Sequence, residues 1–373
     1  MAKLIFRIFI FSTPFFLLLL LELFVVPFGA FNFRSWEAFR PKQFFSALPG
    51  PFYPNKYLEK VEKGDLGPHT KFAVFKNVVW QTDKYGYRTS NNSSYHDVVI
   101  VGDSNIVGSG MSQEDILSEV LEKKSQLSVY PYSPSRIEYF LSEDRFKNDN
   151  PKIVILSCVE RELNGVFLPA KALISPDENI FDRTYNPFLS YLDGKLRNNA
   201  FGVKLVAFLD QALNPNIFRF IRSEITGEVP APLYTYASGK TLFFQGEAAN
   251  KDVSSEDIEK ISDFVEKLRD DLNERGIHII FLPIPNKENI YYKMLPSQKK
   301  PIFLRDLISE LNKRNIDLID TQTLFEDAYE KQGIKPYHTD DTHWNSNGVK
   351  IASDELMKHI NKQMQANEIT NGN

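Results

Sequence analysis

From residue 97 onward, short apolar runs alternate with longer stretches in which apolar residues recur every three or four positions. The short runs, at 98–101, 152–156, 277–285 and 316–320, are typical of strands buried on both faces. The longer stretches predict helices, among them one that Ser254 and Asp257 cap and Gly276 ends, and a last one from about Ser346 to Gln363. Buried strands that alternate with amphipathic helices predict an α/β domain with a mainly parallel sheet.

The most apolar stretch lies near the N-terminus. Between residues 8 and 33 the only charged residue is Glu22, and about 20 apolar residues suffice to cross a bilayer. Lys3 and Arg7 precede this stretch, which favours a cytoplasmic N-terminus. We therefore expect residues 1–33 to form an uncleaved membrane anchor, with the rest of the chain extracytoplasmic (periplasmic or at the cell surface). A cleaved signal peptide is the alternative, although no small-x-small cleavage site stands out.

Two other segments depart from the alternating pattern. Residues 34–95 are rich in Pro, Phe and Tyr and lack long periodicity, so we expect a stalk or N-terminal extension. Residues 165–250 carry many aromatic residues and prolines and predict an insertion, or a lid over the mouth of the sheet. The α/β domain would then span 96–365, and residues 366–373 would form a disordered tail.

Composition excludes some classes of protein. The 373 residues carry a net charge of −4, so the chain lacks the basic field that nucleic-acid binding needs, and we expect no nucleic-acid partner. Cys158 is the only cysteine, which rules out an intramolecular disulfide. Because it lies in a predicted strand, we expect it to behave as a small buried hydrophobe.

The candidate chemistry begins at a serine. Ser104 lies three residues past Val101, at the carboxyl end of a predicted strand, where parallel sheets place their ligand crevices. A serine hydroxyl is a weak nucleophile that needs an adjacent base, itself oriented by an acid. The best base is His343 in the polar loop YHTDDTHWNSNG, with Asp341 two residues and Asp340 three residues before it.

A metal site is the alternative interpretation of this loop. His338, Asp340 and Asp341 are potential ligands, but the chain lacks the close ligand pairs HExxH and CxxC. We therefore favour serine catalysis and expect neither a metal nor another cofactor.

Two motifs together resemble a known superfamily. GDSN at 102–105 and DTHWNSNG at 341–348 resemble the SGNH (GDSL-type) hydrolases, whose fold is a three-layer α/β/α, flavodoxin-like domain. TDKYGYR at 82–88, CVEREL at 158–163 and FLPIPNKENIYYKMLP at 281–296 resemble the SGNH-like alginate O-acetyltransferase group. In those alginate proteins the Asp-x-His pair precedes the serine, whereas here the serine comes first, as in ordinary GDSL esterases.

The resemblance implies roles for individual residues. Ser104 would be the nucleophile, His343 the base and Asp341 the orienting acid, with Asp340 as the alternative acid. The backbone amide of Asn105 would donate to the oxyanion. The superfamily's glycine block is missing from VYPYSPS at 129–135, and an arginine stands where its asparagine block would lie. Ser133, Arg161 and Asn164 are therefore candidates for oxyanion or substrate binding, with a structural salt bridge to Glu160 or Glu162 as the alternative for Arg161. Lys287 follows a strand end at the carboxyl edge of the sheet, where it is a candidate ligand for an anionic glycan or a solvated loop lysine.

The resemblance also implies a function. Membrane-linked, extracytoplasmic relatives acetylate polysaccharides, so we expect an O-acetyltransferase that acts on a polysaccharide or cell-envelope glycan through an acyl-serine intermediate. A membrane-bound O-acyltransferase would be its partner. The same residues with water as acceptor would make a carbohydrate acetylesterase. The missing glycine and asparagine blocks favour a third alternative, a non-catalytic glycan-binding or scaffold protein.

Overall fold

The computed structural model divides into two compact units, which are described separately. It describes residues 2–30, 32–41, 48–146, 149–167, 200–213, 225–226, 232–244 and 253–371. The N-terminal unit comprises Met1–Lys60, Trp80–Tyr87 and Thr184–Ala231, and the sheet unit comprises Val61–Val79, Arg88–Arg183 and Pro232–Asn373. Parts of the expected stalk, residues 61–79 and 88–95, therefore pack in the sheet unit.

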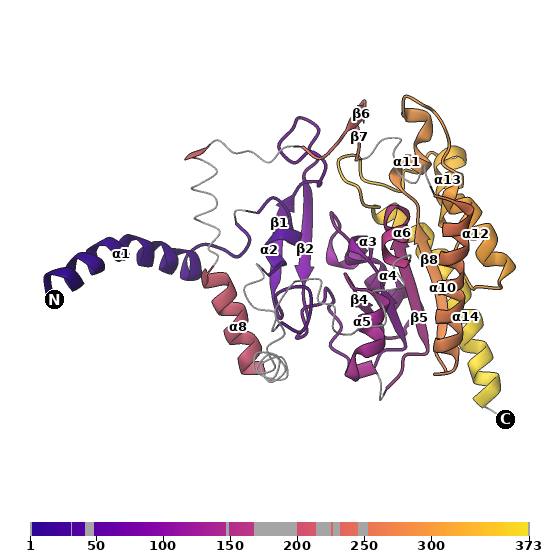
Figure 1. The fold of residues 1–373 in the computed structure, drawn as a ribbon, viewed down its shortest axis with the longest axis horizontal. Helices are drawn as coiled ribbons and strands as arrows, with labels where there is room; N and C mark the ends of the chain where they lie inside the picture. Colours follow the sequence, from indigo (N-terminus) through magenta and orange to yellow (C-terminus); the bar gives the residue numbers. More distant parts are fainter. Residues whose placement is uncertain are drawn as a thin grey trace. The chain divides into compact units, whose positions relative to one another are not determined.

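The sheet unit contains a four-stranded parallel sheet (Figure 1). Its strands, in the order β4-β3-β5-β8, are β4 (Val129–Tyr132), β3 (Val98–Val101), β5 (Ile153–Val159) and β8 (His278–Ile284). Val98 lies opposite Val129 and Ile153 in the register, and all strand residues except His278 are buried. The predicted α/β fold with a parallel sheet is confirmed.

Helices cover the sheet. They are α3 (Ser104–Val107), α4 (Leu117–Ser125), α5 (Ile137–Ser142), α6 (Glu160–Phe167), α10 (Ser255–Asn273), α11 (Lys287–Ile290), α12 (Phe303–Lys313), α13 (Thr321–Gln332) and α14 (Ser346–Asn371). Short 3₁₀ helices lie at Gln113–Asp115, Asp144–Phe146 and Tyr292–Met294. Leu121 of α4 and Leu356 of α14 join Ile100 and Ile155 in one apolar core, while α10 packs against α12 and β8.

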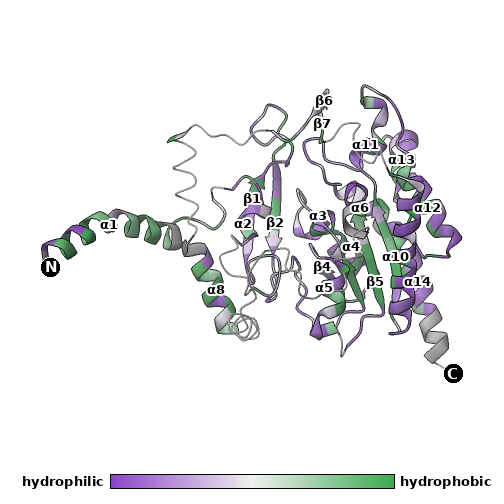
Figure 2. Ribbon diagram, in the orientation of Figure 1, coloured by the Kyte–Doolittle hydropathy of each residue, from purple (hydrophilic) through white to green (hydrophobic). Residues whose placement is uncertain are grey.

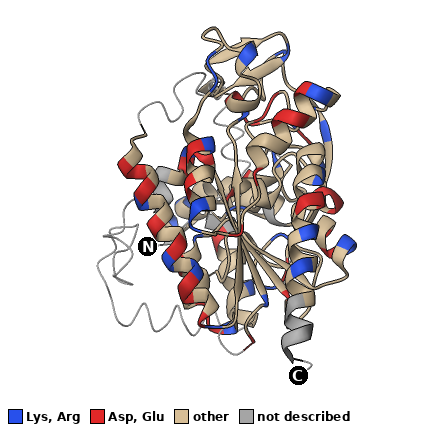
Figure 3. Cartoon of the chain, turned by 90° about the vertical axis from the view of Figure 1, so that its right-hand side faces the viewer, with Lys and Arg blue, Asp and Glu red and all other residues tan. Residues whose placement is uncertain are grey.

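Charge and hydropathy follow this layering. The four strands contain no Lys, Arg, Asp or Glu, and these residues lie on the surrounding helices and loops (Figure 3). The strands are hydrophobic, whereas the helices alternate between hydrophobic and hydrophilic residues (Figure 2). The sheet is thus buried on both faces, and its loop-bearing edges remain as places for polar chemistry.

Three elements differ from the sequence prediction. Residues 316–320 were expected to form a strand, but only Leu318 forms an isolated parallel bridge, with Phe281. Strand β4 was not predicted, because Pro131 lacks an N–H, and it is tolerated since β4 is the edge strand. Helix α14 continues through Asn371, into the tail expected to be disordered. The capping box of Ser254 and Asp257 is confirmed, with both reciprocal hydrogen bonds formed.

Two further pairs of strands lie outside the four-stranded sheet in the described part of the chain. Strands β1 (Tyr57–Glu62) and β2 (Lys76–Gln81) pair with each other. Strands β6 (Tyr236–Ser238) and β7 (Thr241–Phe243) form an antiparallel hairpin in the sheet unit. Most of the predicted insertion or lid at 165–250 lies outside the described residues.

The N-terminal unit carries the apolar helix α1 (Ala2–Phe24), α2 (Ser35–Phe39) and α8 (Ala200–Leu213). Residues Lys3–Leu21 of α1 have a mean hydropathy of 2.4 and are long enough to cross a membrane. A signal sequence has the same length and composition, so these two properties of α1 fit an anchor and a signal sequence equally. A turn follows Thr82, in which the Asp83 carboxylate accepts hydrogen bonds from the amides of Tyr85 and Tyr87.

One buried cation stabilises the loop that follows α3. The Arg88 side chain is 1% exposed and donates to five acceptors: the carbonyls of Val79, Val107, Gly108 and Met111 and the side chain of Gln113. Burial lowers the pKa of Arg88 to about 9, so the guanidinium stays charged at neutral pH. A buried cation that is fully hydrogen-bonded holds several backbone carbonyls at once.

Replacement of Arg88 by methionine removes that cation and leaves buried carbonyls without donors. We expect R88M to lower the free energy of unfolding by about 3–5 kcal/mol. Urea denaturation of the full chain in detergent, followed by tryptophan fluorescence, measures the change. R305M is the matched control, because the Arg305 side chain is 63% exposed, and it should change the value by less than about 0.5 kcal/mol. Equal losses in the two variants would contradict the assigned role of Arg88.

Candidate active site

The Asp103 carboxylate stabilises the turn that carries Ser104 through hydrogen bonds from two backbone amides. Asp103 is the N-cap of α3, and its Oδ1 accepts a hydrogen bond from the backbone amide of Asn105 at 2.7 Å. Its Oδ2 accepts another from the amide of Val159 at 2.6 Å. One carboxylate therefore ties the end of β3 to the end of β5, and Ser104 is presented half-buried at the carboxyl edge of the sheet.

The loop that carries His343 docks on this turn through the next residue. The indole Nε1 of Trp344 donates to the carbonyl of Asn105 at 2.9 Å, and Trp344 is fully buried. A bridge between Tyr337 and Trp344 closes the loop at its base. The loop's position relative to Ser104 is thus determined by packing and hydrogen bonding rather than by chain proximity.

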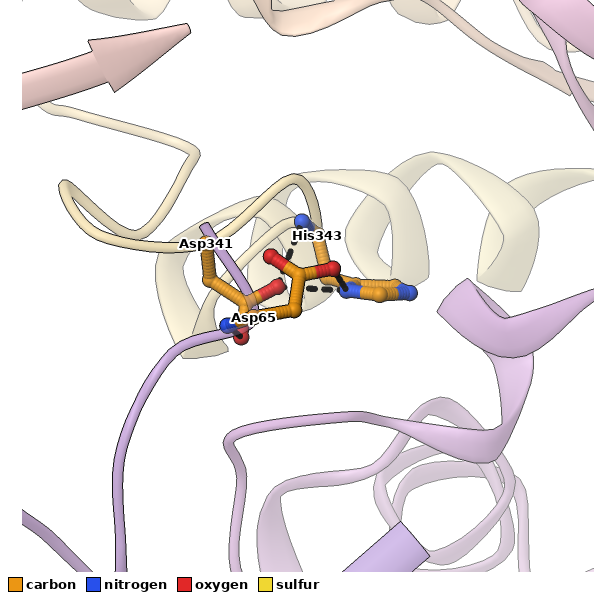
Figure 4. A group of neighbouring side chains, drawn as sticks. All are labelled: Asp65, Asp341 and His343. Carbon is orange, nitrogen blue, oxygen red and sulfur yellow. Dashed lines mark hydrogen bonds and ion pairs between the residues drawn. The ribbon is translucent and has the colours of Figure 1, made fainter. Parts of the chain in front are cut away.

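Ser104, His343 and Asp341 form a continuous hydrogen-bonded chain. His343 Nε2 lies 2.7 Å from Ser104 Oγ, and His343 Nδ1 lies 2.5 Å from Asp341 Oδ1 (Figure 4 shows the Asp341–His343 pair). His343 is 5% exposed and Asp341 is fully buried. This is the order of contacts that a nucleophile, a base and an orienting acid require. The structure brings the three residues together, and their catalytic roles remain predictions.

Asp340 does not serve as the alternative orienting acid. Its carboxylate faces away from His343, accepting hydrogen bonds from the amides of Gly64 and Val74 and forming an ion pair with Lys76 at 2.7 Å. Asp340 is fully buried, so these contacts replace the water it has lost. Two neighbouring aspartates therefore have different tasks, Asp341 at the imidazole and Asp340 at the chain segment 64–76.

Sequence reasoning missed a second carboxylate at the histidine. Asp65 Oδ2 lies 3.6 Å from His343 Nδ1, and the Asp65 carboxylate accepts hydrogen bonds from the backbone amide and the hydroxyl of Thr342 (Figure 4). Nothing in the residues around Asp65 indicates chemistry, because it stands in a Gly- and Pro-rich stretch between Lys63 and His69. Only the fold brings this stretch to the loop.

Two predicted oxyanion donors are already occupied. The backbone amide of Asn105 is hydrogen-bonded to Asp103, and the Ser133 hydroxyl donates to the carbonyls of Gly102 and Asp103, at 3.1 and 2.6 Å. Both residues therefore brace the turn instead of facing a substrate. The physical reason is that the short helix α3 is capped by its own aspartate, which takes the amide that the resemblance assigned to the oxyanion.

Arg161 and Asn164 both lie on α6, directly after β5. The side chain of Asn164 lies outside the described residues. Among the residues described, the guanidinium of Arg161 has no carboxylate within ion-pair distance, so the expected salt bridge to Glu160 or Glu162 is absent. Its cation remains available to a ligand.

Lys287 has a structural environment that neither sequence interpretation predicted. Its Nζ donates to the backbone carbonyls of Leu242, Thr339 and Asp341, at 2.7, 3.0 and 3.1 Å. These contacts use all three N–H groups of the ammonium, and the residue is 2% exposed. Burial lowers the pKa of Lys287 to about 8. Lys287 is therefore neither a solvated loop lysine nor a ligand for an anionic glycan, and it supports the Asp341 loop from beneath.

A small pocket lies beside the Asp341–His343 loop. It is lined by Leu66, Arg161, Phe244, Asn286, Lys287, Glu288 and Thr342. Asn286 is 1% exposed, and its Nδ2 has no hydrogen-bond partner in the described part of the chain. Arg161 and Asn286 thus give one wall of the pocket an excess of donors, suited to the oxygen atoms of a substrate.

The group of Asp65, Asp341 and His343 also has the residue types of a metal site. The contact of 2.5 Å between Asp341 Oδ1 and His343 Nδ1 is a hydrogen bond. Two ligand atoms on one zinc ion, each about 2 Å from it, stand roughly 3 Å or more apart. The arrangement therefore fits a positioned imidazole better than a bound cation.

Comparison with known families agrees with the resemblance. Residues 239–372 match the model of a family described as the SGNH hydrolase-like domain of the acetyltransferase AlgX. The match includes Lys287, Asp341 and His343 and begins after Ser104. No curated protein matches the chain. The predicted resemblance is confirmed for this range, while the assignment of Ser104 rests on its contact with His343.

A second histidine of the loop makes the fold sensitive to acid. Burial lowers the pKa of His338 from 6.5 to about 3, so its stabilising contribution is complete above pH 6.5 and is lost as the pH falls toward 3. At pH 5 the loss is about 2 kcal/mol. We expect H338Q to remove this part of the pH dependence, measured as the difference in unfolding free energy between pH 7 and pH 5.

H359Q is the matched control with the opposite sign. The hydrogen bond to Asp317 raises the pKa of His359, so its contribution is present below 6.5 and is lost as the pH rises through the raised pKa. H359Q should therefore cost more stability at pH 5 than at pH 8. Parallel pH profiles for the two variants would contradict the assigned environments.

Proposed function

We propose, from the match of residues 239–372 to the SGNH hydrolase-like domain of the acetyltransferase AlgX, that this chain is a membrane-anchored, extracytoplasmic O-acetyltransferase. It would transfer an acetyl group to a polysaccharide or cell-envelope glycan through acyl-Ser104. The observation that carries the proposal is the position of His343, with Nε2 at 2.7 Å from Ser104 Oγ and Nδ1 at 2.5 Å from Asp341.

The first half-reaction loads the serine. His343 Nε2 takes the proton of Ser104 Oγ as the oxygen attacks the carbonyl carbon of the acyl donor. The resulting imidazolium is stabilised by the buried Asp341 carboxylate. When the tetrahedral intermediate collapses, His343 returns the proton to the departing donor group, and an ester bond to Ser104 remains.

The oxyanion of this intermediate needs donors. The amide of Asn105 is occupied by Asp103, so we assign the backbone N–H of Ser104 itself, for which the described residues provide no acceptor. Arg161 and Asn286 in the neighbouring pocket are the side chains that we assign to substrate oxygens. This assignment replaces the donors that the superfamily's glycine and asparagine blocks would supply.

The second half-reaction transfers the acyl group. A hydroxyl of the glycan gives its proton to His343 and attacks the acyl carbon, and the proton then returns to Ser104 Oγ. Water in the same position would make the chain a carbohydrate acetylesterase, the second candidate. The contacts of Ser104 and His343 serve both reactions equally. The description of the matched family as an acetyltransferase domain therefore decides our preference for transfer.

The apolar helix α1 supports the cellular part of the proposal. Residues Lys3–Leu21 have the length and hydropathy of a membrane span. As an anchor, α1 would keep the enzyme at the membrane surface, where a membrane-bound O-acyltransferase partner would supply activated acetyl groups. Lys3 and Arg7 before the span support this topology.

Incubation of the full chain in detergent with 4-nitrophenyl acetate tests the proposal. We expect intact-mass spectrometry to find one acetyl group on the wild type and none on S104A. D341N should slow the labelling by about 10³–10⁴-fold, because the imidazole loses its orienting charge. D354N is the control, since the Asp354 side chain is 60% exposed, and it should label at the native rate. Labelling of S104A at the native rate, or no labelling of the wild type, would contradict the proposed acyl-Ser104 intermediate.

The choice between transferase and esterase needs a second measurement. Acetyl-enzyme prepared with the same ester is mixed with candidate glycans, and the acetyl group is followed into glycan ester or free acetate. A transferase should deliver most of it to a hydroxyl of the correct glycan. Release as acetate alone, with every glycan tried, would favour the esterase.

A further inference from the structure

We propose that Asp65 is a second carboxylate of the catalytic histidine, a positioning residue delivered by a segment that precedes the sheet in sequence. The inference rests on the proposed function, in which His343 becomes an imidazolium at each half-reaction. Asp65 Oδ2 lies 3.6 Å from His343 Nδ1, the same nitrogen that Asp341 holds at 2.5 Å (Figure 4).

Asp65 is delivered by a segment that wraps around Asp340. The amides of Gly64 and Val74 donate to Asp340 Oδ2 at 2.9 and 2.8 Å, and Lys76 forms an ion pair with Oδ1. The amide of Leu66 donates to the Asp340 carbonyl at 3.2 Å. Four donors from one segment thus converge on one residue of the catalytic loop, so the two chain segments form one hydrogen-bonded structure.

Gly64 allows the segment to approach this closely. A Cβ at position 64 would lie 2.1 Å from the carbonyl oxygen of Asp340. No side chain fits at that distance, because the neighbour is backbone and cannot rotate away. The contact places the next residue, Asp65, directly beside Asp341 and Thr342.

Asp65 forms hydrogen bonds with two consecutive residues of the His343 loop, Asp341 and Thr342. Its amide donates to Asp341 Oδ2 at 3.1 Å, and its carboxylate accepts from the amide and hydroxyl of Thr342 at 2.9 and 2.8 Å. Its side chain is 12% exposed. The carboxylate is therefore held on the flank of the imidazole and shielded from solvent, where its charge acts at short range.

The charges around His343 show what Asp65 adds. The carboxylates of Asp341 and Glu162 favour a positive charge on the His343 imidazole. His338 interacts electrostatically with His343 and with Lys76. Lys287 interacts with both Asp341 and Asp65. Lys287 and Asp341 are both buried and opposite in charge, so Lys287 weakens the field of Asp341 at the ring. Asp65 supplies a second negative charge that maintains the stabilisation of the imidazolium.

The test compares two variants that separate charge from position. D65N removes the charge and keeps the size of the side chain. T342V keeps the charge and removes the Thr342 hydroxyl, which contacts both the Asp65 carboxylate and His343 Nδ1, at 2.8 and 3.3 Å. The full chain in detergent, with isotope-labelled histidine, is titrated by NMR, and the His343 signal is assigned from the H343Q spectrum. We expect D65N to lower the pKa of His343 by about one unit, T342V to shift it by less, and the exposed-site control D354N to leave it unchanged.

The acid limb of the pH profile for acetyl-enzyme formation should move to lower pH in D65N by the same amount. An unchanged His343 titration in D65N, or an equal shift in T342V, would overturn the inference. Should D65N fail to fold, D65S provides a second uncharged variant. Since the NMR titration needs no turnover, it gives its answer even if wild-type chain forms no acetyl-enzyme, which would contradict the proposed function alone.

Discussion

The site depends on a single carboxylate that has no access to water. Asp340 is fully buried, and an unpaired ion in that position would cost several kcal/mol. The cost is offset by two backbone amides and the ammonium of Lys76. Because these partners come from residues 64–76, the burial of Asp340 forces a distant segment against the loop of His343. The same constraint places Asp65 beside His343.

The orientations of three neighbouring aspartate side chains determine which groups they bind. Asp340 and Asp341 are adjacent, yet one faces the segment 64–76 and the other the imidazole. Asp65 comes from that segment and faces the imidazole from a second side. Lys287, on three carbonyls beneath the loop, holds the backbone of Asp341 in the conformation that this division requires.

The serine side of the site is equally preorganised, at the expense of the donors that a substrate would use. Asp103 and Ser133 form their hydrogen bonds within the turn, and Arg88 donates to backbone carbonyls of the loop after α3. A rigid turn keeps the Ser104 hydroxyl within reach of His343 without reorganisation, which is the condition for efficient proton transfer. In the proposed reaction, substrate oxygens would take their donors from elsewhere, at Ser104's own amide and in the pocket of Arg161 and Asn286.

The sequence by itself determined the elements whose signal is local. Apolar runs such as 98–101 predict buried strands, and Ser254 with Asp257 predicts a helix start, because both depend only on neighbouring residues. Residue type and place at a strand end or in a loop also made Ser104 and His343 the candidates, while Asp341 and Asp340 stayed open as alternative acids. The edge strand with Pro131 was missed because its tolerance depends on where it lies in the sheet.

Only the tertiary structure decided how the polar groups pair. That Asp341 rather than Asp340 holds the imidazole, that Asp65 joins it, and that the Asn105 amide and the Lys287 ammonium are already occupied depend on partners up to 277 positions away. A buried donor or acceptor must be satisfied by whatever group the fold brings to it. Chain order carries no record of that group, so no pattern of neighbouring residues could have revealed it.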